Sequence, residues 1–391
     1  MAYAILDVRE WDTVVRMDTG EPLPMNSPKV NTPMLDMARQ VIKGHPYPGD
    51  FSSKSIEWVT DTALRLWKTY DPHFMFMIYA QPGILGGVKY MTPDRWNSLV
   101  CRVFQNVNRF IEITGYIPII VGLGDMVPLK EYIDLSGLDG IGYIRMPNRR
   151  YAGFYNPTDR DISRFDRMPG IERTVSKCDF INLFEPSDVF RERLPDYLIV
   201  AKEGYSFKTL GTSSRTGYKT IAKNEAIPVY TGLPNTEINS LVDLKDTVIK
   251  NINHQRIALI LLDGIGTKDF PGEYRLCNNS LYWYTYCQGD DSYFAVSCGE
   301  HFQHSDYPPG WLDFTEDFEM KTYPYDGFIE KPLSGSIGNY LRTKMGITSA
   351  AAGSRSTFTH LSGGADICIE CCCCGLYNYG TKAVIYKTQA S

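Results

Sequence analysis

Three nearly uninterrupted apolar runs constrain the fold of this chain more than any other feature of its sequence. They are HFMFMIYA at residues 73–80, YIPIIVGL at 116–123 and IALILL at 257–262. Strands that are apolar on both faces are typical of parallel sheets covered by helices on each side. None of the runs reaches the ~18 apolar residues of a membrane span, so no membrane insertion is expected.

Segments with helical spacing of apolar residues alternate with these runs. Helices are predicted over residues 31–44, 52–71, 92–114 and 236–252, the third opening with the strong start signal Thr-Pro-Asp. The alternation predicts an α/β fold with a doubly wound, mostly parallel sheet and helices on both faces.

Changes in composition divide the chain into three predicted parts. Residues 1–270 form the α/β core. Residues 271–335 are rich in aromatic side chains, Gly and Pro, and are expected to form an insertion or cap. Residues 336–391 are expected to return to the core.

Two of the apolar runs stop at a carboxylate beside a glycine, Asp125 after Gly124 and Asp263 before Gly264. Parallel strands bring their carboxyl ends to one edge of a sheet, where ligands of open α/β folds bind. Asp125 and Asp263 are therefore candidate metal ligands, predicted at a common edge and close enough to share one ion. The alternative is ordinary turn chemistry at strand ends.

A second candidate metal site is the segment CGEHFQHSD at residues 298–306. It contains His301 and His304 together with Cys, Glu and Asp, all of which ligate transition metals. The alternative is a solvated loop, in which the two imidazoles have no ligand role.

The overall charge and the cysteines limit the partners and the setting. The formal net charge is -5 and basic residues are scattered, so no nucleic-acid partner is expected. Five of the ten cysteines lie within CIECCCCG at residues 368–375. Neighbouring cysteines rarely form a disulfide framework, and no signal peptide is recognised. Reduced, mostly buried thiols and a cytoplasmic location are therefore expected; a metal–thiolate cluster is the alternative.

Tyrosine and phenylalanine are abundant, at 26 and 18 residues. Aromatic side chains are enriched at protein interfaces. A protein partner or self-assembly is therefore expected.

The order of elements over residues 58–129 resembles the middle of the alkaline phosphatase superfamily. The closest branches are the type I phosphodiesterases and the cofactor-independent phosphoglycerate mutases. Residues 194–234 resemble their Gly-x-His-Gly segment and the following strand. Residues 256–266 resemble the strand with which such proteins begin, so the resemblance implies a permuted order.

The resemblance implies that an active protein holds a divalent metal, Zn or Mn, at Asp263 and Asp125. It also implies a Ser or Thr nucleophile in a loop at the sheet edge. The segment SRSTFTHLSGG has this composition, and Ser356, Thr357 and His360 are its candidate catalytic residues. The alternative is a Ser/Thr-rich turn.

The sequence departs from the family pattern where most ligands are expected. Residues 81–90 contain neither Asp nor His, residues 124–128 lack the His, and the Gly-x-His position ends in Lys219. A catalytic di-metal site needs several protein ligands held together. We therefore expect a catalytically silent protein that acts through binding or assembly. The alternative is a metal-dependent phosphoester hydrolase or phosphotransferase with a Ser/Thr nucleophile.

Overall fold

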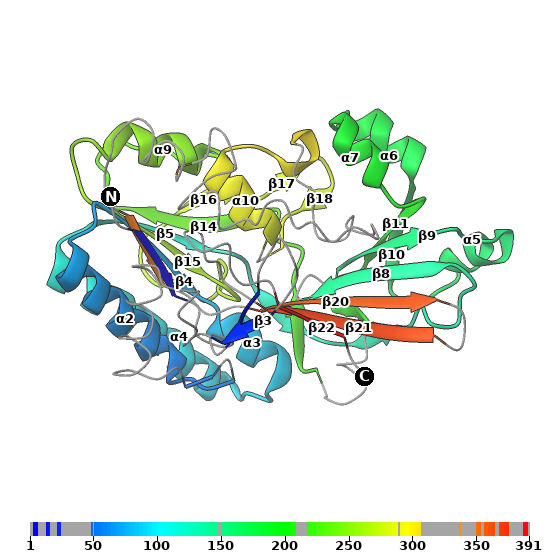
Figure 1. Ribbon diagram of the computed structural model, residues 1–391, viewed down its shortest axis with the longest axis horizontal. Coiled ribbons are helices and arrows are strands. Elements are labelled where there is room, and N and C mark those ends of the chain that lie inside the picture. Colours follow the sequence, from blue (N-terminus) through cyan, green and yellow to red (C-terminus); the bar gives the residue numbers. More distant parts are fainter. Residues whose placement is uncertain are drawn as a thin grey trace.

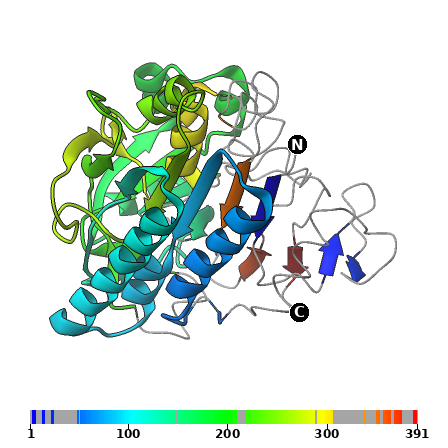
Figure 2. The ribbon, with the colours of Figure 1, turned by 90° about the vertical axis from the view of Figure 1, so that its left-hand side faces the viewer.

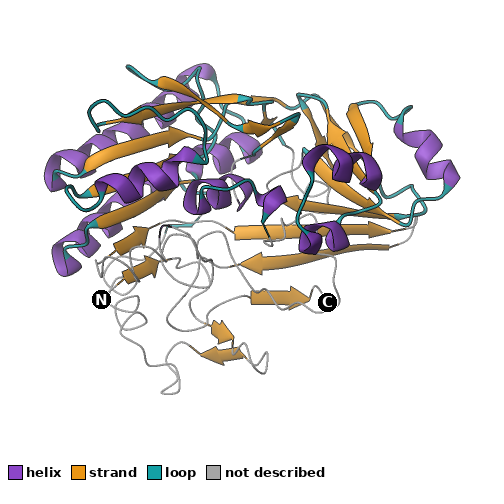
Figure 3. Cartoon of the chain, turned by 90° about the horizontal axis from the view of Figure 1, so that it is seen from above, coloured by secondary structure: helices purple, strands orange, loops and turns teal. Residues whose placement is uncertain are grey.

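The computed structural model describes residues 48–49, 51–146, 150–208, 217–287, 290–305 and 337, together with the backbone of short strands in both terminal segments. The helix predicted over residues 31–44 and most of residues 306–348 lie outside this part. Two sheets organise the chain, toward opposite ends of its long axis (Figures 1 and 3).

Within the described part, the first sheet has seven strands in the order β1-β19-β4-β15-β5-β14-β16. Their bounds are Tyr3–Leu6, Ser349–Ala352, Phe74–Tyr79, Ile257–Leu262, Ile117–Gly122, Ala226–Thr231 and Arg275–Asn278. The pairs from β1 to β5 are parallel, and β14 and β16 continue the sheet antiparallel. The fold is therefore mixed α/β with a mixed sheet.

The central strands of this sheet are buried along their whole length, as their apolar sequences predict. Every residue of β4 and β15 is buried. Met77 and Ile260 belong to the core on one face, and Ile78 and Leu261 to the core on the other. The alternation follows from the two-residue period of a strand.

Helices pack against both of these cores (Figures 1 and 2). On one face lie α2, Ser55–Tyr70, and α4, Pro93–Thr114, with the short α3, Gln81–Val88, near the strand ends. On the other face lie α9, Asp243–Asn251, and α10, Asp290–Cys298.

Local signals explain the bounds of α4. The Thr92 side chain accepts a hydrogen bond from the Arg95 N–H, Pro93 takes the first helical position, and Gly115 ends the helix with φ 69°. These are the preferred cap residues for each position. The predicted start and end are confirmed.

The second sheet also has seven strands among the described residues, in the order β10-β11-β9-β8-β20-β21-β22. Their bounds are Ile171–Ser176, Tyr197–Ala201, Tyr151–Tyr155, Ile141–Met146, Ser356–Gly363, Ile367–Cys374 and Tyr386–Gln389. All its pairs are antiparallel. The expectation of mostly parallel strands does not hold here, because neighbouring strands as close in the sequence as β8 and β9 can only pair antiparallel.

Smaller elements surround the two sheets. The helices α5, α6 and α7 are Asp159–Phe165, Lys177–Phe184 and Asp188–Arg193. The short strands are β2 Thr13–Val15, β3 Pro22–Pro24, β6 Met126–Pro128, β7 Glu131–Ile133, β12 Tyr205–Phe207, β13 Lys219–Ile221, β17 Ser280–Leu281 and β18 Tyr284–Thr285. A 3₁₀ turn, η1, spans Phe302–His304.

The aromatic-rich region predicted as an insertion begins with β16, which pairs with β14 in the first sheet. One of its aromatic side chains contacts the second sheet: the Tyr151 ring of β9 stacks on Tyr284 of β18 with centroids 4.3 Å apart. None of the helices in the described part is long and apolar enough to span a membrane.

Candidate functional site

The carboxyl edge of β5 and β15 carries both candidate carboxylates. The two strands pair in parallel with Leu262 opposite Gly122. Asp263 directly follows β15, and Asp125 lies three residues beyond β5. The predicted common edge is therefore confirmed, and the sharing of one ion stays a prediction.

Asp263 is 1 % exposed and held by protein groups. The Tyr293 hydroxyl of α10 lies 3.0 Å from its Oδ1 and 3.1 Å from its Oδ2, and donates to the carboxylate. The Asp263 carbonyl accepts from the Gly83 N–H of α3 at 3.0 Å. This close approach explains the glycine that follows: at Gly264, with φ 75°, a Cβ would lie 2.5 Å from the Gly83 nitrogen.

Asp125 is 7 % exposed and closes the turn that follows β15. Its Oδ1 accepts from the Lys268 N–H and its Oδ2 from the Thr267 hydroxyl, each at 3.2 Å. A Cβ on Gly266 would come within 2.2 Å of the Asp125 nitrogen, so the turn packs directly on this residue. Its own N–H donates to Asn224 Oδ1 at 3.0 Å. Asp125 is thus part of the local hydrogen-bond network.

Lys219 also reaches this edge, which sequence reasoning did not propose. It begins β13, and β13 pairs with β6 just beyond Asp125. Its Nζ lies 3.6 Å from the centroid of the Trp96 ring, and the Trp96 indole N–H donates to Asp269 Oδ2 at 2.8 Å. No local pattern pointed to this contact, because Trp96 fits the apolar face of α4 and Lys219 lies far away in the sequence.

His301 and His304 follow α10, and one ring nitrogen of each forms a hydrogen bond with a protein group. The Nδ1 of His301 shares a hydrogen bond with the Tyr286 hydroxyl. The Nε2 of His304 lies 3.0 Å from the Phe184 carbonyl oxygen. A carbonyl only accepts, so this Nε2 carries the proton and has no lone pair for a metal. Asp306, the last residue of the predicted cluster, lies outside the described residues.

The surroundings of His301 favour its neutral form. Burial lowers the pKa of His301, and the nearby His304 lowers it further. The two rings are 6.0 Å apart and nearly perpendicular. Neutral imidazoles are required for metal binding, but the pair is supported by no third ligand in the described region.

The candidate nucleophiles Ser356 and Thr357, and His360, lie in β20 rather than in a loop. This strand pairs with β21 and β8, with His360 opposite Ile144. These residues belong to the second sheet, whereas Asp125 and Asp263 follow strands of the first. Their side chains are not among those described.

The cysteine run forms much of β21, so its backbone is in the second sheet. Its side chains are also outside the described residues, and their predicted burial stays a prediction. Among the described cysteines, Cys101, Cys178 and Cys277 carry free thiols.

The metal implied by the resemblance does not fit the side chains in the described part of the chain. No group of three or more His, Cys, Asp or Glu side chains is placed there to hold an ion. Asp263 and Asp125 accept hydrogen bonds from protein donors, and Lys219 brings a positive charge to the same edge.

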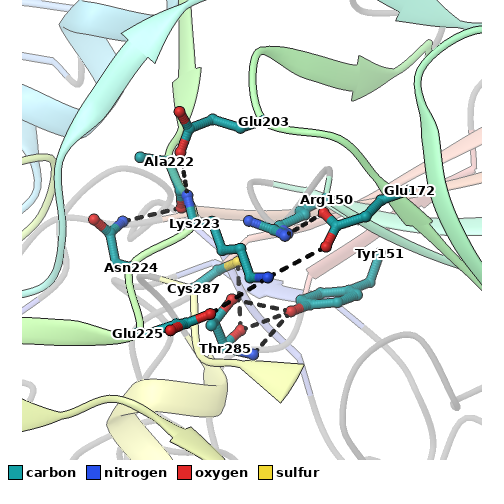
Figure 4. Close-up of polar contacts among 10 residues, drawn as sticks. All are labelled: Arg150, Tyr151, Glu172, Glu203, Ala222, Lys223, Asn224, Glu225, Thr285 and Cys287. Atoms are coloured by element: carbon teal, nitrogen blue, oxygen red, sulfur yellow. Dashed lines mark hydrogen bonds and ion pairs between the residues drawn. The ribbon is translucent and has the colours of Figure 1, made fainter. Parts of the chain in front are cut away.

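A second polar cluster lies where the second sheet meets the segment before β14 (Figure 4). Glu172 of β10 accepts from Arg150 Nη2 at 2.8 Å and pairs with Lys223 Nζ at 3.3 Å. Lys223 Nζ also lies 3.3 Å from the Glu225 carboxylate. The backbone N–H of Lys223 donates to the Glu203 carboxylate at 3.1 Å. Three carboxylates thus surround two cations, and the cluster links the second sheet to the segment before β14.

No known protein family, curated protein or solved structure matches the chain. The resemblance to the alkaline phosphatase superfamily therefore stays a prediction.

Proposed function

We propose that this protein is a catalytically silent, alkaline phosphatase-like α/β protein that acts through binding or assembly. The observation that carries the proposal is the state of Asp263 and Asp125. Both are buried, and both accept hydrogen bonds from protein donors, Tyr293 for one and Thr267 with Lys268 for the other. These hydrogen bonds occupy acceptor positions of both carboxylates, and no group of three or more candidate ligand side chains is found among the described residues.

The ligand requirement of phosphoryl transfer explains why the state of these two carboxylates argues against an enzyme. Metal ions in such enzymes neutralise the transferred group and activate the nucleophile, and they need several ligands fixed around them. The edge of the first sheet provides two carboxylates, together with the ammonium of Lys219. A fixed positive charge at this edge disfavours a divalent cation through like-charge repulsion.

Exposed aromatic side chains support a role in binding. Tyr90 and Tyr282 are 67 % and 62 % exposed, and Leu276 is 59 % exposed. Aromatic side chains provide much of the contact energy of protein interfaces. We propose a protein partner or a second copy of the chain as the ligand, a doubly wound arrangement of the first sheet and, from the free cysteines, a cytoplasmic location.

The second candidate function is a metal-dependent phosphoester hydrolase or phosphotransferase. It is favoured by the common edge at which Asp125 and Asp263 lie. In this alternative, Ser356 or Thr357 is the nucleophile and His360 assists it.

Metal analysis and one activity assay distinguish the two functions. We expect purified protein to contain no stoichiometric Zn or Mn, and to hydrolyse bis(p-nitrophenyl) phosphate no faster than buffer with either metal added. Stoichiometric metal together with hydrolysis would establish the enzyme, provided that Asp263→Asn loses both. The double variant Ser356→Ala/Thr357→Ala then shows whether these hydroxyls supply the nucleophile.

A further inference from the structure

The ammonium group of Lys219 lies on an aromatic face. Its Nζ is 3.6 Å from the centroid of the Trp96 ring. Trp96 is 5 % exposed, and Lys219 itself is half-buried. A cation is attracted to the negative face of an indole, and the attraction is largest where water is excluded.

Two carboxylates complete the surroundings of this ammonium. Asp269 accepts the Trp96 indole N–H at 2.8 Å, so its negative charge is fixed beside the ring. Burial lowers the pKa of Lys219, while the charges of Asp269 and Asp125 act in the opposite direction. The cation therefore has an aromatic face on one side and two negative charges close by.

The backbone explains how one lysine side chain reaches the sheet edge. β13 pairs antiparallel with β6, which places Lys219 opposite Pro128. The neighbouring Tyr218 N–H donates to the Gly87 carbonyl at the end of α3. These contacts hold the start of β13 beside α3 and α4, over the carboxyl ends of β5 and β15.

We propose that Trp96, Asp269 and Asp125 form a site for an organic ammonium ion, which the Lys219 side chain occupies from within the chain. The inference rests on the proposed function, in which this edge holds no metal. The ligand class follows from the Trp96 ring, because an aromatic face binds alkylammonium ions and the two carboxylates add only negative charge beside it.

The test is to remove the internal cation and supply an external one. The Lys219→Ala substitution removes the side-chain atoms that n-propylammonium contains, so this ion is the probe. Thermal unfolding is measured with n-propylammonium chloride and with NaCl at the same ionic strength. At a concentration roughly tenfold above the dissociation constant, we expect a rise in Tm of about 2 °C for Lys219→Ala. The wild-type protein should show no such rise.

Three variants serve as controls. In Lys219→Met, a neutral side chain fills the same space, so n-propylammonium should have no effect. In Lys223→Ala, the lost ammonium had paired with Glu172 and Glu225 instead of a ring, so again no effect is expected. In the double variant Lys219→Ala/Trp96→Leu, loss of the aromatic face should abolish the response.

Equal responses of all the proteins to n-propylammonium, or no response of Lys219→Ala, would overturn the inference. Lys219→Ser opens the same space and is measured in parallel, so that poor folding of one variant does not decide the outcome. Absence of a response leaves the proposed function standing. Stoichiometric metal in the wild-type protein would overturn the proposed function, whatever the ammonium response.

Discussion

Replacing Asp125 separately by Asn and by Ala distinguishes a structural role of its carboxylate from a role in metal binding. Asn keeps the shape of the side chain and one acceptor oxygen, but it loses the negative charge that a metal site needs. Ala removes both the hydrogen bonds and the charge. The two roles therefore predict different orders of stability for the same pair of variants.

The expected loss of unfolding free energy in Asp125→Ala follows from the two hydrogen bonds that the carboxylate accepts. The Lys268 N–H and the Thr267 hydroxyl donate to different oxygens of Asp125, each at 3.2 Å. A hydrogen bond to a charged group contributes about 1.5–3 kcal/mol, and bonds of this length fall at the lower end. Ala should therefore lower the free energy of unfolding by about 3 kcal/mol.

Asn should be much less disruptive at the same position. Its carbonyl oxygen can still accept from Lys268, and its amide can donate to the Thr267 oxygen, which accepts as well as donates. We expect a loss of about 1 kcal/mol. The weaker attraction to Lys219 is included in this figure.

Urea unfolding followed by tryptophan fluorescence measures these differences, with EDTA or MnCl₂ as the added variable. We expect the order wild type, Asn, Ala, and no change of any curve with either addition. A ligand that binds only the folded protein raises its stability. The structural role is refuted if EDTA destabilises the wild type, or if Asn is as damaging as Ala.

Three further substitutions test other parts of the structure. Burial and the nearby His304 lower the pKa of His301, so the folded state resists protonation and its stability should fall as pH drops below about 6.5. His301→Asn should flatten this fall in urea titrations between about pH 7 and pH 5, and an unchanged slope would contradict the assignment. Asp161 accepts three backbone N–H groups, so Asp161→Ala should cost about 3 kcal/mol; a cost below about 1 kcal/mol would show these bonds to be weak. Tyr293→Phe removes a donor to Asp263 and should cost about 2 kcal/mol in the same assay, whereas an unchanged midpoint would exclude this role.

The elements that the sequence predicted well are those specified by neighbouring residues. Thr92, Pro93 and Gly115 mark the ends of α4, and the apolar run 257–262 is the buried strand β15. Caps act within one helical turn, and burial on both faces requires an unbroken apolar run. Both signals can be recognised without knowledge of the partner elements.

The elements that the sequence did not predict depend on contacts between residues far apart in the chain. Residues 81–88, QPGILGGV, form α3 although glycine disfavours helices. Gly86 is required by packing, since a Cβ there would lie 2.9 Å from the Trp96 ring. Ser356–Gly363 resembled a turn because Ser and Thr suit both turns and strands, and only pairing with β8 decides between them.

The same limit applies to the candidate site. The common edge of Asp125 and Asp263 followed from strand direction, which the pattern of apolar runs already contains. The donors Tyr293 and Thr267 and the cation Lys219 arrive from other parts of the chain. Because of these contacts, the two candidate ligands belong to an internal hydrogen-bond and charge network. No local sequence motif predicts such contacts.

The position of β15 in the first sheet has a consequence for synthesis on the ribosome. β15 pairs with both β4 and β5, although both of them leave the ribosome long before it does. A nascent chain that stops short of residue 257 therefore has two apolar strands whose shared neighbour has not yet been made. Unpaired apolar edges of this kind favour aggregation and recruit chaperones. The centre of the sheet can therefore close only after residues 257–262 have been translated, and a chain that ends before them lacks the strand between β4 and β5.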